Sequence, residues 1–242
     1  MIPKTHPRYQ SLTIRDRIVK GVKLGITSLH GLAAHGRGEA FDYLLGEKTH
    51  DFAKQSIEAA VAMLVLAKHP VISVNGNSAA LAAKELVVLS KLLNGPLEVN
   101  LFHASKAREK KIADYLKKHG ATNVLLPEKN TAIPFLDSNR KFVNKNGIFK
   151  ADVVFAPLED GDRTEALIKN GKKVITIDLN PLSRTAQKAT ITIVDNITRA
   201  MPLLIKSIKV YQKYDEKRLE NILNKYNNVK ILSQALLKIK SD

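Results

Sequence analysis

The chain has 242 residues, of which 44% are hydrophobic, and this size and composition suit one large domain with a well-buried core. It contains no cysteine, which excludes disulfides, thiolate nucleophiles and cysteine-ligated metals and makes a cytoplasmic protein the default expectation. The formal net charge of +16 would suit a polyanionic partner. However, the lysines alternate with apolar residues at helical spacing and tryptophan is absent, so we do not expect nucleic-acid binding as the main function. No apolar run approaches the roughly 18 residues that a membrane span needs.

Residues 1–69 are predicted to form an N-terminal helical segment, with helices over 14–25 and 51–68. Between these helices lies the sequence HGRGEAFDYLLGE, which starts at His35. Glycine permits positive φ or close approach to a ligand, and arginine presents a planar fork of donors to phosphate or carboxylate. The stretch therefore predicts an anion-binding loop around Gly36, Arg37 and Gly38, with a glycine turn carrying surface charges as the alternative.

Residues 70–200 alternate short β-branched runs with longer helical patterns, which predicts an α/β fold: a Rossmann-like, mainly parallel sheet flanked by helices. The predicted strands cover 71–74, 97–102, 123–126, 153–156, 174–178 and 190–194. The predicted helices between them cover 78–93, 106–119 and 164–169. Residues 128–150 are irregular, and we expect a loop crossing the active site or a small hairpin.

The C-terminal segment, residues 201–242, is predicted to form amphipathic helices over 201–214 and 217–240 that cover a sheet edge or an oligomer interface. The whole chain, 1–242, is thus predicted to be a single α/β domain with helical segments at both ends.

Polar residues follow the predicted strands, and in open α/β sheets ligands bind beyond the carboxyl ends of the strands. The first strand runs into Asn75, Gly76, Asn77 and Ser78, which predicts an anion site at a helix N-terminus. A plain N-cap at Asn77 or Ser78 is the alternative.

Further polar turns follow the later strands. The strand at 153–156 runs into a turn with Glu159, Asp160 and Asp162, which can hold Mg²⁺, accept hydrogen bonds from a substrate ammonium or cap the next helix. Asp178, at the end of the next strand, can accept a ribose hydroxyl, and Asp195 follows the last strand. The coincidence of these turns favours a phosphate-rich ligand, such as a nucleotide, although none contains a specific nucleotide motif.

The motifs resemble those of the archaeal 4-phosphopantoate:β-alanine ligases, also called phosphopantothenate synthetases. The resemblance spans residues 6 to about 200 and includes the sequences HPRY, HGRGEAFDYL, NGNS, LEDGDRTEAL and DLNPLSRTA. It implies a homodimer with a Rossmann-like core that condenses 4-phosphopantoate with β-alanine at the expense of ATP. The products would be 4′-phosphopantothenate, AMP and diphosphate, formed through an acyl adenylate on the way to coenzyme A.

This chemistry brings two polyanions together, so it needs converging arginines, helix N-termini and Mg²⁺, whose protein ligands the sequence does not identify. We expect catalytic roles for Arg37 and for Glu39 or Glu159, either of which could take the proton of the β-alanine amine. The expected substrate-binding residues are Arg8, Arg15, Gly36, Gly38 and Arg140. The expected nucleotide-binding residues are Asn75, Gly76, Asn77, Ser78, Asp178, Asn180, Ser183, Arg184, Asp195 and Asn196.

Another nucleotide-dependent enzyme with a Rossmann-like cleft is the main alternative, because a fold alone does not determine the chemistry. A basic nucleic-acid-binding protein is a weaker one, with an affinity that would fall steeply with salt.

Overall fold

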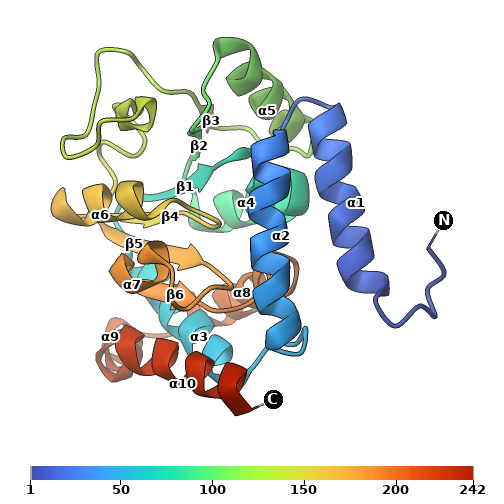
Figure 1. Cartoon of the computed structure of the whole chain (residues 1–242). Helices are drawn as coiled ribbons and strands as arrows, with labels where there is room; N and C mark the ends of the chain where they lie inside the picture. The colour runs from blue at the N-terminus through green and yellow to red at the C-terminus, as the bar shows by residue number, and fades with distance from the viewer. Residues whose placement is uncertain (1, 242) are drawn as a thin grey trace.

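A six-stranded, all-parallel sheet forms the centre of the computed structural model, which describes residues 2–241 (Figure 1). Its strands are β1 (Pro70–Val74), β2 (Leu97–Val99), β3 (Val124–Leu125), β4 (Val153–Phe155), β5 (Lys173–Ile177) and β6 (Ile191–Ile193). Their order in the sheet is β3-β2-β1-β4-β5-β6, the arrangement of a doubly wound Rossmann sheet. The predicted α/β class and Rossmann-like core are therefore confirmed.

The strands are mostly apolar on both faces, as expected of a parallel sheet covered by helices on each side, and Glu98 in β2 is a buried exception. Val71 pairs with Val154 and Ile72 with Phe155, so alternate side chains enter opposite cores. Ile72 and Phe155 join the larger core, whereas Val71 and Val154 pack in a second one. β2 and β3 are shorter than predicted.

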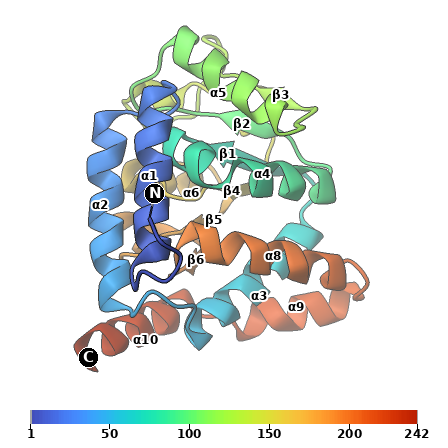
Figure 2. The same cartoon turned by 90° about the vertical axis from the view of Figure 1, so that its right-hand side faces the viewer.

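The helices of the described residues are α1 (Tyr9–Lys23), α2 (Leu29–Leu44), α3 (Asp51–Leu66), α4 (Gly76–Leu93), α5 (Lys106–Lys118), α6 (Gly161–Lys169), α7 (Arg184–Lys188), α8 (Ile197–Tyr211), α9 (Glu216–Lys225) and α10 (Asn228–Ser241). Buried side chains of α4, α5 and α8 belong to the larger core, and those of α6 to the second one. In both views α1 and α2 lie side by side beside the sheet (Figures 1 and 2). Within residues 2–241, no helix is long and apolar enough to cross a membrane.

The predicted anion-binding loop around Gly36, Arg37 and Gly38 is wrong in conformation, because all three residues lie inside α2. Neither glycine has a positive φ. Ser28 starts the helix by accepting a hydrogen bond from the Gly31 N–H. Tertiary packing of α2 against α1 and α4 outweighs the low helix propensity of its glycines.

The predicted helix over 217–240 is also wrong, because it is broken between α9 and α10. Tyr226 leaves the helical conformation, with φ −81° and ψ 137°. Its hydroxyl accepts a hydrogen bond from the Thr192 N–H at 3.2 Å, and Asn228 Oδ1 accepts from the same N–H at 2.9 Å. These contacts with β6 are possible only because the helix is interrupted.

Residues 128–150 form no regular hairpin, and their predicted place across the active site stays a prediction. They form an irregular loop that contains one antiparallel bridge, Ala132 with Phe142, and a short 3₁₀ helix over Asn139–Lys141. The loop packs Ile133 and Val143 into the second core. Its function in the fold is to carry Arg140 to the ends of the central strands. The division of the chain into one domain with helical ends stays a prediction.

Candidate active site

The order of strands reverses between β1 and β4, and this is where open α/β sheets bind ligands. A cleft of about 290 Å³ lies there. Its lining residues come from the segments 27–37, 75–77 and 101–108, together with Arg140, Leu158 and Asp160. The N-termini of α2 and α4 border this cleft, so it favours an anionic ligand.

Asn75 joins the ends of the two central strands. Its Oδ1 accepts the Ser78 N–H at 2.9 Å, and Ser78 Oγ accepts the Asn75 N–H at 3.0 Å, which forms a capping box for α4. Asn75 Nδ2 donates to the carbonyl oxygens of Pro157 and Leu158 at 3.0 and 2.9 Å. The N-cap is therefore Asn75, and the alternative that placed it at Asn77 or Ser78 is wrong.

Asn77 ties α4 to the start of α2. Its Nδ2 donates to the Gly31 carbonyl at 2.8 Å, and its Oδ1 accepts from the Thr27 hydroxyl. A Cβ at Gly31 would lie 2.3 Å from Thr27 Oγ1 and 2.5 Å from Asn77 Oδ1, so only glycine fits here. The side chains of Asn75, Asn77 and Ser78 are thus engaged in the fold. The first backbone N–H groups of α4, at Gly76 and Asn77, face no intrahelical acceptor.

Arg140 enters the cleft from the long loop and is almost fully buried. Its Nη2 donates to Glu159 Oε2 at 2.8 Å, and its Nη1 pairs with Asp160. Arg163 pairs with the same Glu159 carboxylate from the other side and is completely buried, and this burial lowers the pKa of Arg163. Glu159 is therefore held between two guanidinium groups.

Glu98 on β2 fixes the loop that carries Arg140. Its carboxylate accepts the backbone N–H groups of Asn144 at 3.0 Å and Ile148 at 2.7 Å. Burial raises the pKa of Glu98 to about 7, although these hydrogen bonds act in the opposite direction. Asn100 adds a second anchor, because its Oδ1 accepts from Arg140 Nε at 2.9 Å.

A second polar group lies after β5. Asp178 accepts the Ser183 hydroxyl, and it accepts the Asn180 N–H at 2.9 Å. Burial raises the pKa of Asp178, and the nearby charge of Arg37 opposes that shift. Arg37 also lines the cleft, so its exposed side chain lies between the cleft and the end of β5.

A third group joins α2 to the end of β6. Arg199 pairs with Asp42 at 2.5 Å and with Asp195 at 2.7 Å, and Asn196 Nδ2 donates to Asp42 at 2.9 Å. Asp195 and Asn196 are buried, and Asp42 of the HGRGEAFDYL motif contacts Asn196 directly and Asp195 through Arg199. Arg184, by contrast, forms an exposed pair with Glu165 at 2.5 Å.

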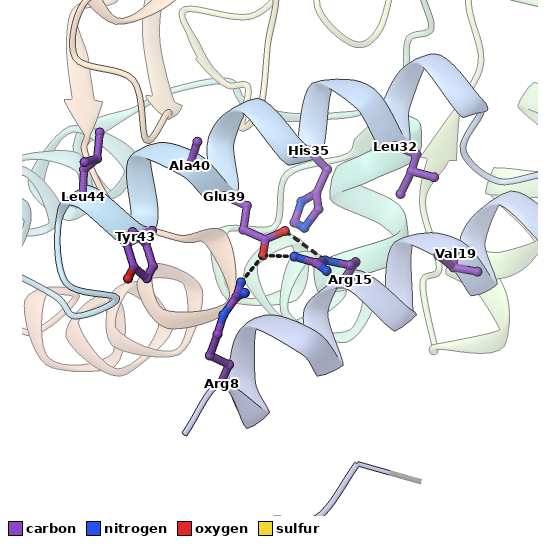
Figure 3. Close-up of a pocket in the computed structure, with 10 residues that line it drawn as sticks. Arg8, Arg15, Val19, Leu32, His35, Glu39, Ala40, Tyr43 and Leu44 are labelled. Carbon is purple, nitrogen blue, oxygen red and sulfur yellow. Dashed lines mark hydrogen bonds and ion pairs between the residues drawn. The ribbon is translucent and has the colours of Figure 1, made fainter. Parts of the chain in front are cut away.

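Arg8, Arg15 and Glu39 meet in a separate groove of about 800 Å³ between α1 and α2 (Figure 3). The Glu39 carboxylate pairs with Arg8 at 2.8 Å and with Arg15 at 2.5 Å. Although burial acts against it, the hydrogen bond and charge of Arg15 lower the pKa of Glu39. Gly36 also lines this groove, whereas Gly38 faces Leu179 Cδ1, which would lie 3.7 Å from a Cβ there.

A model of the Phosphopantothenate/pantothenate synthetase family matches residues 52–242. A protein of Thermococcus kodakarensis named 4-phosphopantoate–beta-alanine ligase is 52% identical over 240 residues, which cover 99% of this chain and 92% of the relative. A protein of the same name from Methanosarcina mazei is 49% identical over 238 residues, covering 98% of this chain and 94% of the relative. The chain belongs to this family. The family and the ligase class that the sequence motifs indicate are therefore confirmed.

Most of the predicted site residues lie in one of three places in the synthetase fold, and Gly38, Ser78, Glu159 and Arg184 line neither the cleft nor the groove. The cleft takes Arg37, Asn75, Gly76, Asn77 and Arg140. The ends of β5 and β6 take Asp178, Asn180, Ser183, Asp195 and Asn196. The groove between α1 and α2 takes Arg8, Arg15, Gly36 and Glu39.

Some cleft residues of this synthetase have no signal in the sequence. His30, His103 and Arg108 line the cleft, yet His30 and His103 lack metal-ligand spacing and Arg108 lies in a lysine-rich helix. Their placement depends on packing between segments that are distant in the chain.

Proposed function

We propose that this chain is an ATP-dependent ligase that condenses 4-phosphopantoate with β-alanine to 4′-phosphopantothenate. The observation that carries the proposal is similarity along nearly the whole chain to relatives named 4-phosphopantoate–beta-alanine ligase. The cleft at the strand-order reversal, lined by Arg37 and bordered by the N-termini of α2 and α4, supports it because both ATP and the acid substrate are polyanions.

We propose that the reaction proceeds through an acyl adenylate. A carboxylate oxygen of 4-phosphopantoate attacks the α-phosphorus of ATP, and the bond to diphosphate breaks. The β-alanine nitrogen then attacks the acyl carbon, AMP leaves with the electron pair of the acyl–oxygen bond, and the nitrogen loses its proton. Preorganised cations lower the barrier to the first step because they offset the repulsion between the two anions.

We assign the acid substrate to the cleft and the nucleotide to the ends of β5 and β6. A cavity of about 290 Å³ is at the small end of ligand sites, which suits an acid with one phosphate better than a nucleoside triphosphate. The Asp178 carboxylate could accept a ribose hydroxyl. Arg37 then lies between the two ligands. This arrangement gives the N–H groups of Gly76 and Asn77 to the acid substrate, which departs from the sequence-based prediction of a nucleotide contact there.

The general base stays a prediction. Glu39 pairs with two arginines, and so does Glu159, and both carboxylates would have to exchange these partners to accept a proton. Either of them could equally hold the ammonium of β-alanine.

We propose that Mg²⁺ enters with the phosphates of ATP. Within residues 2–241, no group of three or more histidine and carboxylate side chains is arranged to hold a metal. This fits Mg²⁺, which is commonly held by substrate phosphates and one or two carboxylates, and Asp160 is the carboxylate that lines the cleft. The Mg²⁺ would offset negative charge on the phosphates. Activity that persists in excess EDTA would contradict this role.

We also propose a homodimer joined through exposed apolar side chains of α2, two of which, Tyr43 and Leu44, lie at the groove between α1 and α2. Leu29, Tyr43 and Leu44 on this helix are 71%, 65% and 47% exposed, which favours coverage by a second chain. Light scattering should give twice the chain mass, and the Leu44→Glu variant should shift towards the monomer. A wild-type monomer would contradict the proposal.

The function itself is tested by measuring AMP and diphosphate release from purified protein with Mg-ATP, 4-phosphopantoate and β-alanine, omitting each in turn. The ligase predicts release and phosphopantothenate formation only in the complete mixture. Formation of ADP would instead indicate a kinase, and no turnover would contradict the proposal.

A further inference from the structure

Arg108 lines the cleft without a carboxylate partner among the described residues. Its Nε and Nη2 both donate to the Ile26 carbonyl at 3.2 Å, and its Nη1 donates to the His103 carbonyl at 3.3 Å. A guanidinium has five N–H groups, so these three bonds leave two donors for a ligand. By contrast, Arg140, which lines the same cleft, is neutralised by Glu159 and Asp160.

Arg108 lies against the start of α4. A Cβ on Gly76 would be 2.8 Å from Arg108 Nη2 and 2.6 Å from the Ile26 carbonyl oxygen, so a side chain at position 76 would push the guanidinium away. Because position 76 is glycine, the guanidinium approaches the helix end where the N–H groups of Gly76 and Asn77 face no intrahelical acceptor. A single anion can therefore receive hydrogen bonds from both.

Two histidines add hydrogen-bonding groups to this corner of the cleft. The rings of His30 and His103 lie with their centroids 4.7 Å apart, and both line the cleft. Arg108 and the two imidazoles come from three different segments: α5, the start of α2 and the loop after β2. Their convergence gives up to four side-chain donors in one corner of the cavity.

We infer that Arg108, with His30 and His103, binds the phosphate of 4-phosphopantoate and makes the enzyme specific for the phosphorylated acid. A phosphate monoester has three terminal oxygens, which match an arginine fork, imidazole donors and backbone N–H groups better than the two oxygens of a carboxylate. The substrate carboxylate would then face Arg37, on the side of the proposed nucleotide site. This inference rests on the proposed ligase reaction.

The main test is steady-state kinetics of the Arg108→Gln variant with each substrate varied separately. We expect KM for 4-phosphopantoate to rise about 10- to 100-fold, the effect of losing a charge-assisted contact. KM for ATP should stay within about twofold of wild type. The exposed Lys110→Gln variant on the same helix is the matched control and should leave both values unchanged.

A second comparison separates phosphate recognition from a structural effect. Pantoate lacks the phosphate, so Arg108→Gln should reduce the preference for 4-phosphopantoate over pantoate about 10-fold or more. Equal losses of kcat/KM with 4-phosphopantoate and with pantoate would overturn the inference. A rise in the KM for ATP alone would also overturn it, because it would assign Arg108 to a nucleotide phosphate.

Calorimetric titration of 4-phosphopantoate without ATP keeps the two proposals distinguishable. Binding that weakens in Arg108→Gln supports the phosphate site even if no ligation is observed, whereas failed ligation by wild-type protein contradicts only the proposed function. If Arg108→Gln does not fold, the exposed His30→Asn and His103→Asn variants replace it, and unchanged binding in both would overturn the inference.

Discussion

Replacement of Asn75 by alanine should destabilise the protein by about 2–4 kcal/mol. The variant loses the N-cap of α4, which is worth about 0.5–2 kcal/mol. It also loses the two hydrogen bonds from Nδ2 to the carbonyls of Pro157 and Leu158, each worth about 0.5–1.5 kcal/mol. For a chain of this size, the melting temperature should fall by about 5–15 °C.

Urea unfolding at equilibrium measures the loss, and a second variant divides it into its two causes. Asn75→Ser keeps an oxygen for the cap but has no donor for the strand-end carbonyls, so it should lose about 1–3 kcal/mol. Asn224→Ala on the exposed face of α9 is the control and should change the stability by less than about 0.5 kcal/mol. If Asn75→Ala were as stable as this control, Asn75 would not join β1 to β4 as described.

Three further predictions test other parts of the structure. Gly31→Ala should destabilise the protein because a Cβ at this position has no room. Gly36→Ala should stabilise α2 by up to about 1 kcal/mol because no atom lies within 4 Å of the added Cβ. Equal melting temperatures of the two variants would contradict this packing. Burial raises the pKa of Glu98 from 4.5 to about 7, so the protonated side chain stabilises the folded state. This stability is complete below pH 4.5 and is lost as the pH rises through about 7. The loss should be on the order of 3 kcal/mol. Urea unfolding across this range should show that slope in wild type but not in Glu98→Gln, and an identical slope in both would assign it to another group. Arg37→Ala should lower kcat/KM about 10- to 100-fold while Lys117→Ala leaves it unchanged, and near-wild-type kinetics would remove Arg37 from the site.

The sheet could be predicted from the sequence because each strand is a short apolar run bounded by helical periodicity, as at Val71 and Val153. The parallel order then placed Asn75 and Asp178 at strand ends without further information. The conformation of residues 36–38 could not be predicted, because local glycine content indicates a loop and only packing against α1 and α4 keeps the segment helical. Arg108 escaped prediction for a related reason: its role depends on Ile26 and Gly76, which are distant in the chain.

The interruption between α9 and α10 has a consequence for association between molecules. β6 is an outer strand of the sheet, and an unpaired N–H on such a strand is a template on which another chain can add a strand. Tyr226 and Asn228 occupy the Thr192 N–H from within the same chain. The break between α9 and α10 thus covers an edge N–H on which another chain could otherwise add a strand. Truncation before Tyr226 would uncover the Thr192 N–H, and we expect the shortened protein to self-associate.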